Sequence, residues 1–115
     1  MNSFQIKSPL FGLSVQFFVG EFDKSEFIAT MVKLDPAFNE ISLDIDVAEA
    51  HGKCWDCGHN QIIWLENDSV AVAAHEIVHA AFGTAASIGF DSDESSQEYH
   101  AYFTQWALSE FLINT

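Results

Sequence analysis

The chain has no Arg and only four Lys against 17 acidic residues, which gives a formal net charge of −13 at pH 7. Such a charge repels the phosphate backbones of DNA and RNA, so it argues against direct nucleic-acid binding. The sequence also lacks an apolar run long enough to span a membrane, and its beginning lacks the pattern of a signal peptide. We therefore expect a cytoplasmic protein, whose favoured partner is a basic peptide or protein.

Cysteine and proline are scarce as well, with two residues of each in 115. The chain needs no disulfide framework, because 49% of its residues are hydrophobic and a chain of this length buries about two thirds of its unfolded surface. No internal repeat, linker or low-complexity tract divides the sequence. We predict a single domain over residues 1–115.

The first half of the chain contains both extended and helical patterns. Residues 11–22 are rich in Val, Phe and Leu, which predicts a strand or the arm of a hairpin. Residues 23–33 carry apolar side chains at helical spacing, and Asp23 is the expected cap of this short helix. Residues 40–47 alternate strictly between polar and apolar side chains and form the clearest strand pattern.

The second half predicts a loop over residues 48–60, a strand over 61–66 and two helices. The first helix follows the capping residues 67–69 and is expected to be about 18 residues long. The second helix, capped by Ser95 or Ser96, carries an apolar face to the end of the chain. Together the elements predict an α+β fold, with a small mixed sheet, a short N-terminal helix and two packed C-terminal helices.

The first of these C-terminal helices contains the string His75-Glu76-Ile77-Val78-His79. Residues four apart lie on the same face of a helix, so both imidazoles can bind one ion while Glu76 reaches a water molecule beside it. Two histidines are suited to Zn²⁺, which takes three protein ligands and a water in a catalytic site. The alternative is a pair of core histidines, which would cost about 1 to 3 kcal/mol each if left without partners.

A third ligand is expected in the last helix or in the acidic stretch before it. The candidates are Asp91, Asp93, Glu94, Glu98 and His100. Glu98 is favoured because it shares a helix face with Ala101 and Tyr102, and the small Ala101 lets the other helix approach closely.

The order of strand 61–66, the H-E-x-x-H helix, a loop and a helix with Glu98-Tyr99-His100-Ala101-Tyr102 resembles the minimal core of gluzincin-type metallopeptidases. It also resembles small zincin-like proteins encoded by bacteriophages, which carry H-E-x-x-H and a later E-x-x-A-Y. The resemblance covers residues 61–112, about half of the chain, and it departs at Gln97, where the phage proteins tend to have a second acidic residue. It implies a zincin-like fold, Glu98 as the third zinc ligand and peptide hydrolysis.

In a complete site of this kind, Glu76 would take the proton from water, and the resulting hydroxide would attack a peptide carbonyl. Tyr102, His100 and Tyr99 are the candidate donors to the oxyanion, and Tyr102 is favoured because it shares a helix face with Glu98. An aromatic side chain at this spacing is more often part of the core. The strand 61–66 is expected to be the edge on which an extended peptide pairs.

A second group of residues comprises His51, Cys54, Cys57 and His59. It fits a Cys2His2 zinc site, a redox dithiol, or simply a turn whose thiols stay reduced. The tight spacing favours the turn, because a structural zinc site normally takes its ligands from two separate segments.

The acidic composition supports a hypothesis of a different class. The protein would be a non-catalytic inhibitor, of the nucleic-acid-mimic kind used by phages, that occupies a basic groove on a host protein. The metal would then be structural. An open coordination position beside a groove would favour the hydrolase, and a closed, buried site would favour the inhibitor.

Overall fold

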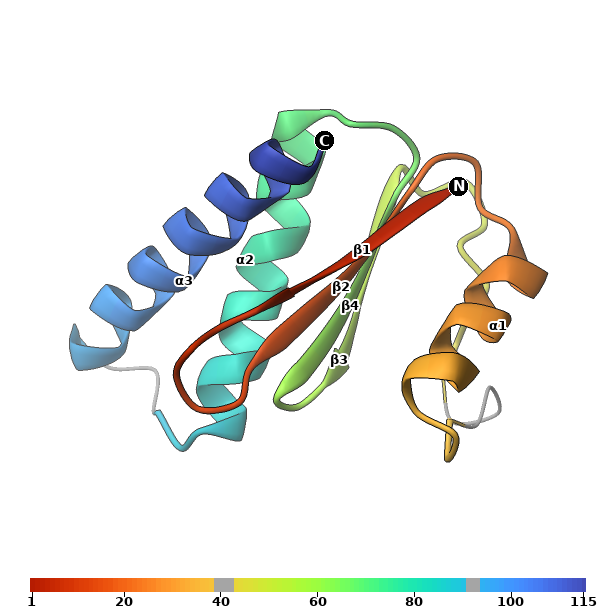
Figure 1. Ribbon diagram of the computed structural model, residues 1–115. Coiled ribbons are helices and arrows are strands. Elements are labelled where there is room, and N and C mark those ends of the chain that lie inside the picture. Colours follow the sequence, from red (N-terminus) through yellow and green to blue (C-terminus); the bar gives the residue numbers. More distant parts are fainter. Residues whose placement is uncertain (39–42, 91–93) are drawn as a thin grey trace.

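The computed structural model describes residues 1–38, 43–90 and 94–115, with helices on both faces of a central sheet (Figure 1). In chain order the elements are β1 (Asn2–Lys7), β2 (Ser14–Val19), α1 (Lys24–Leu34), β3 (Gly52–Cys57), β4 (Asn60–Leu65), α2 (Val70–Ser87) and α3 (Glu94–Asn114). The four strands have the order β1-β2-β4-β3, in which β2 and β4 are parallel and the two outer pairs are antiparallel. Helices α2 and α3 cover one face, and α1 covers the other. The predicted α+β fold with a mixed sheet is confirmed.

The two central strands are apolar on both sides, because each face of the sheet is covered by helix. On the α2 and α3 side, Phe17 of β2 and Ile63 of β4 pack in one core cluster with Phe111 of α3. On the α1 side, the next residue of each strand, Phe18 and Trp64, packs with Phe27 of α1 in a second cluster. Continuous apolar sequence in β2 and β4 therefore reflects burial on two faces.

The helix predictions agree closely with the structure. Helix α1 begins after Asp23, whose side chain accepts a hydrogen bond from the backbone N–H of Glu26 (3.1 Å). Helix α2 is 18 residues long and follows Ser69 as its N-cap. Helix α3 begins at Glu94, so Ser95 and Ser96 lie in its first turn and not at its cap. None of the helices that the structure describes is long and apolar enough to cross a membrane.

The strand predicted over residues 40–47 is wrong for residues 43–47, and its first part lies outside the described residues. Asp44 and Asp46 accept hydrogen bonds from backbone N–H groups two residues ahead, at 3.2 and 2.9 Å, which bends the chain at each Asp. Their backbone carbonyls accept bonds from Lys53 Nζ (2.8 and 3.0 Å). These contacts replace a strand ladder, and the alternating apolar Ile45 is buried against α1 and β3.

Two further strand predictions need correction. Residues 52–57 form β3, inside the stretch that was predicted as a loop, and β1 was not predicted at all. The signal for β3 was the two-residue hairpin connection Gly58-His59, with Gly58 at φ 75°, just before the apolar residues 62–65. Because β3 pairs outside β4, the strand that was expected to be the peptide-binding edge lies inside the sheet.

Candidate metal centre

Helix α2 contains the H-E-x-x-H string, whose two histidines lie beside the face of the helix that packs against the sheet. Small side chains such as Ala73, Ala80 and Ala81 face the core together with Ile77 and are completely buried. They let the helix lie close to the sheet, and the cap at Ser69 fixes where it begins. The histidines lie off this face and are exposed, so they are not the core pair of the alternative interpretation.

The side chains of His75, Glu76 and His79 meet in one group. One ligand atom from each lies within 4.8 Å of the others, and the two imidazole centroids are 5.0 Å apart. Among the residues that the structure describes, this is the group of His, Cys, Asp and Glu that could hold a metal ion. The structure therefore brings together the helical part of the predicted site.

Glu76 differs from its two neighbours because it is buried, with 5% of its surface exposed. Within the described part of the chain its carboxylate has no hydrogen-bond partner. Burial raises the pKa of Glu76 above its ordinary value, and the nearby His75 and His79 oppose this shift. The carboxylate oxygens are not sealed from water, since Glu76 lines two cavities, so the group can hold a water molecule instead of a protein partner.

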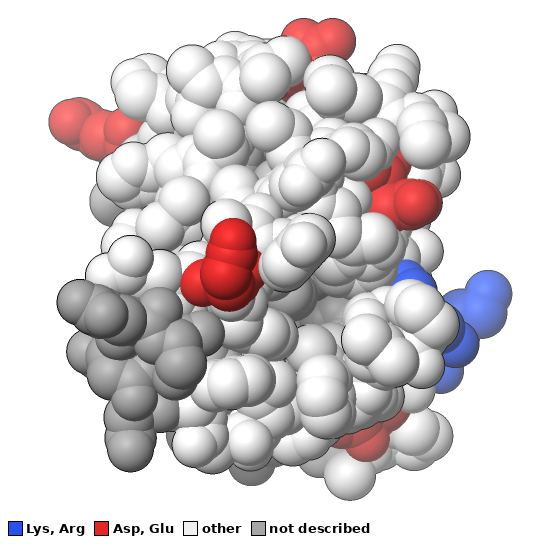
Figure 2. Space-filling view, turned by 90° about the vertical axis from the view of Figure 1, so that its left-hand side faces the viewer, with Lys and Arg blue, Asp and Glu red and all other residues white. Residues whose placement is uncertain are grey.

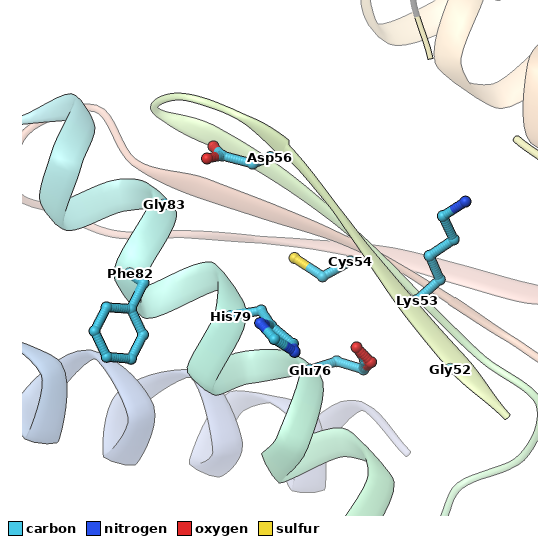
Figure 3. Close-up of a pocket in the computed structure, with 8 residues that line it drawn as sticks. All are labelled: Gly52, Lys53, Cys54, Asp56, Glu76, His79, Phe82 and Gly83. Carbon is cyan, nitrogen blue, oxygen red and sulfur yellow. The ribbon is translucent and has the colours of Figure 1, made fainter. Parts of the chain in front are cut away.

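Strand β3 forms the wall opposite Glu76. A cavity of about 480 Å³ lies between β3 and α2, and Figure 3 shows its side chains. Cys54 and Asp56 point from β3 toward the helix, whereas Glu76, His79 and Phe82 project from the helix (Figure 3). A second cavity, of about 370 Å³, lies on the other side of Glu76 and is lined by His51, Gly52, Ala71, Val72 and His75. Glu76 thus faces open space between the two cavities.

Two glycines bring α2 and β3 into contact at the ends of the larger cavity. A Cβ added at Gly52 would lie 2.8 Å from Val72 Cγ1 and 3.1 Å from Glu76 Cγ. A Cβ added at Gly83 would lie 2.7 Å from Gln61 Nε2 and 2.8 Å from Asp56 Oδ1. A side chain at Gly52 would therefore displace Val72, and one at Gly83 would displace the Gln61 and Asp56 side chains, so either would change the shape of the cavity.

The outer edge of β3 is open, since no described strand pairs with it. The Glu66 N–H donates to the His51 carbonyl at 2.8 Å, which marks a hydrogen-bonded pair of the antiparallel ladder. Every second residue after His51 therefore bonds to β4, and the residues between them, Gly52, Cys54 and Asp56, direct their N–H and C=O groups outward. The three residues whose backbone groups are free at this edge therefore also line the cavity.

The predicted residues of α3 lie elsewhere. Glu98 is exposed and does not belong to the group formed by the histidines and Glu76. The buried face of α3 carries Phe103, Ala107 and Phe111, and helical geometry places Glu98 well away from it. Tyr102 is 69% exposed and does not line the cavity. Asp91 and Asp93 lie outside the described residues.

His100, another of the predicted candidates, faces α2 and contacts Phe82, with ring centroids 4.3 Å apart. Its Nδ1 donates to the backbone carbonyl of Ser96 at 2.6 Å, which leaves the lone pair on Nε2. Nε2 is buried and has no hydrogen-bond partner among the described residues. The hydroxyl of Tyr99 is engaged, because it donates to Thr84 Oγ1 at 2.6 Å.

The second predicted group does not assemble. Cys54 and Cys57 are three residues apart on a strand, so their side chains point to opposite faces of the sheet. Cys54 faces the cavity, where burial raises the pKa of its thiol to about 12, and Glu76 and Asp56 add to the shift. Neither a shared metal nor a redox dithiol fits this arrangement.

The histidines of that group have other partners. His51 Nδ1 lies 2.5 Å from a carboxylate oxygen of Glu66, and His59 Nδ1 is hydrogen-bonded to the Ser87 hydroxyl. Each imidazole ties β3 or its hairpin turn to a neighbouring segment.

Comparisons of the chain with protein-family models, with curated proteins and with solved structures find no match.

Proposed function

We propose that this protein is a zinc-dependent peptidase of the zincin type, in which His75 and His79 bind Zn²⁺ and Glu76 is the general base. The observation that carries the proposal is the meeting of two exposed imidazoles with the carboxylate of Glu76, which lines the cavity beside an open strand edge. Each part is found in other settings, but a peptide hydrolase needs all three in one place.

The donor atoms fit zinc. Imidazole nitrogen is a preferred ligand of Zn²⁺, and the two histidines offer it on adjacent turns of one helix. Bound zinc would lower the pKa of a coordinated water toward neutrality and polarise a substrate carbonyl. The resemblance to gluzincins implies Glu98 as the third ligand; because Glu98 is exposed and outside the group, its binding to the metal would require a different placement of α3.

Glu76 suits the role of a base that accepts a proton from water. Its carboxylate reaches the group from the next position of the helix and faces the cavity. A pKa raised by burial makes the carboxylate a stronger base than an ordinary Glu, and bases with a pKa closer to neutrality transfer protons more efficiently.

The substrate would bind as an extended segment paired with β3. The outward N–H and C=O groups of Cys54 would hydrogen-bond to the peptide backbone and hold it beside Glu76 and His79. This assigns to β3 the role that the sequence had suggested for the strand 61–66.

The openness of the site supports the hydrolase over the acidic inhibitor. Both histidines are exposed, and a cavity adjoins them on either side of Glu76. In addition, the described acidic side chains on the face shown in Figure 2 are separate spots and do not form a continuous row.

The metal is tested by measuring zinc content and affinity in wild type, His75→Ala and His79→Ala, with His59→Ala as the matched control. The control removes one imidazole of the same domain that is not part of the group. We expect one zinc per wild-type chain and in His59→Ala. Removing His75 or His79 should weaken binding by more than the ~10- to 100-fold that loss of a ligand's hydrogen-bond partner costs. Stoichiometric zinc in both variants would refute the site.

Hydrolysis is tested with Glu76→Gln, which keeps the shape of the side chain and removes the base. Zinc-loaded wild type should cleave peptides in a mixed unstructured pool, read by mass spectrometry. Glu76→Gln should bind zinc but cleave about 100- to 10,000-fold more slowly. Glu110→Gln, on α3, serves as a control that should cleave like wild type. Equal cleavage by Glu76→Gln, or none by the zinc-loaded wild type, would contradict the proposal.

A further inference from the structure

Asp56 is a carboxylate held in place at the end of the cavity farthest from Glu76. Its Oδ1 accepts two hydrogen bonds, from Gln61 Nε2 at 2.7 Å and from the Gly58 N–H at 3.0 Å. Its Oδ2 has no hydrogen-bond partner among the described residues. The side chain points from β3 toward Gly83 of α2 (Figure 3). Asp56 is therefore an oriented carboxylate with one oxygen left for a ligand.

No basic side chain among the described residues of the cavity lining pairs with Asp56. Asp56 and Glu76 line the cavity together with Lys53 and with His79, which is a ligand of the proposed metal. Lys53 points away from the cavity (Figure 3). Its ammonium group is occupied by Asp44, through the carboxylate at 3.4 Å and the carbonyl at 2.8 Å. Lys53 therefore does not neutralise Asp56, whose negative charge would attract a cation.

The position of Asp56 on β3 determines which part of a bound peptide it meets. Asp56 and Cys54 both direct their backbone groups outward and their side chains toward α2. In a peptide paired antiparallel to β3, the residue opposite Asp56 would point its side chain to the same face, with its Cβ about 4.5 to 5.5 Å away. That residue lies two positions from the one opposite Cys54 and four from the one opposite Gly52, where an added Cβ would come within 3.1 Å of Glu76 Cγ.

We propose that Asp56 makes this edge selective for extended peptides that carry Lys or Arg opposite it. This inference rests on the proposed peptide-binding role of β3, and it names the substrate class of that site. A basic side chain there would bind Asp56 Oδ2, whereas an acidic one would be repelled by the Asp56 carboxylate.

The test measures binding separately from cleavage. The protein is zinc-loaded Glu76→Gln, and the probes are blocked, fluorescent heptapeptides with a β-prone sequence and Lys, Arg, norleucine or Glu at each position in turn. We expect Lys and Arg to bind at least about fivefold more tightly than norleucine at one position, measured by fluorescence anisotropy. The advantage should shrink as NaCl is raised, because the pair is open to solvent.

The decisive variant is Asp56→Asn in the same background. Asparagine keeps an oxygen that can accept from Gln61 and Gly58 but carries no charge. The preference for Lys over norleucine should fall to about one. Asp35→Asn removes the same charge from an exposed Asp that also accepts a backbone hydrogen bond, at the end of α1, and should retain the preference.

The outcomes separate this inference from the proposed function. Binding without preference, a preference that survives Asp56→Asn, or no binding of any peptide each overturns the role of Asp56. If wild type cleaves peptides regardless of Lys or Arg, the inference fails and the peptidase stands. If Glu76→Gln binds basic peptides with the expected preference and wild type cleaves none, the inference stands and the peptidase fails.

Discussion

At the scale of single residues, the carboxyl group of Glu76 combines burial with the lack of a partner. Its raised pKa means that the folded metal-free chain binds the proton more tightly than the unfolded chain does. Below the ordinary pKa of 4.5 both states are protonated, and the group has no effect on stability. As pH rises from there through the folded pKa, the folded state loses stability.

The loss of stability with rising pH leads to a prediction for Glu76→Gln. In metal-free protein at pH 7, the variant should be more stable than wild type, because it removes a buried negative charge. The difference should disappear below about pH 4, where wild-type Glu76 is neutral. Urea unfolding curves at pH 4 and pH 7, recorded with a chelator present, measure it. A variant that is less stable at pH 7 would show that the carboxylate stabilises the folded chain.

The two thiols should differ in reactivity. Cys54 is half-buried and its pKa is raised to about 12, whereas Cys57 is exposed on the other face of β3, and burial and Asp56 raise the pKa of its thiol by less. Alkylation needs the thiolate, so iodoacetamide at pH 8 should modify Cys57 well before Cys54 in the native protein. Peptide mapping by mass spectrometry reads the order, and urea-unfolded protein is the control in which both should react alike. Equal rates in the native state, or a Cys54–Cys57 disulfide, would show that the thiols share one environment.

At the scale of elements, the site depends on how closely β3 approaches α2. Gly52→Ala would place a methyl group against Val72, Glu76 and Leu65, at 2.8, 3.1 and 3.2 Å. We expect a loss of about 1 to 3 kcal/mol in the free energy of unfolding, because overpacking forces neighbours out of position. Chemical denaturation measures this loss.

A second variant identifies the cause. Val72→Ala removes the Cγ1 atom that lies closest to the added methyl group. In that background Gly52→Ala should cost about 1 kcal/mol less than in wild type, which a double-mutant cycle detects. Additive costs would mean that the two elements do not meet at Gly52 as described.

At the scale of the whole molecule, the net charge of −13 means that the acidic side chains repel one another, because four Lys cannot neutralise 17 carboxylates. Folding brings the carboxylates closer together, so screening by salt should stabilise the folded chain. Between ~10 mM and ~500 mM NaCl we expect the melting temperature to rise by about 4 °C, or about 1 kcal/mol. KCl at equal ionic strength should act identically, which separates screening from binding of a specific ion. A melting temperature that is constant or falls with salt would contradict this account.

The sequence by itself determined the features that depend on neighbours along the chain. The helix α2, its cap at Ser69 and the meeting of His75, Glu76 and His79 follow from spacing within a few turns. The same holds for α1 and for the general fold class, because apolar patterns reveal which segments must be buried.

Only the tertiary structure decided which strand forms the edge of the sheet and which residues face His75, Glu76 and His79. Residues 43–47 alternate as a strand would, yet the hydrogen bonds of Asp44 and Asp46 hold them outside the sheet. The strand β3 had a weaker pattern, and pairing with β4 made it the wall of the site. The same pairing directs Cys54 and Cys57 to opposite faces of the sheet and places Asp56 in the lining of the cavity. Strand order and register join residues far apart in the sequence, and local spacing carries no information about such contacts.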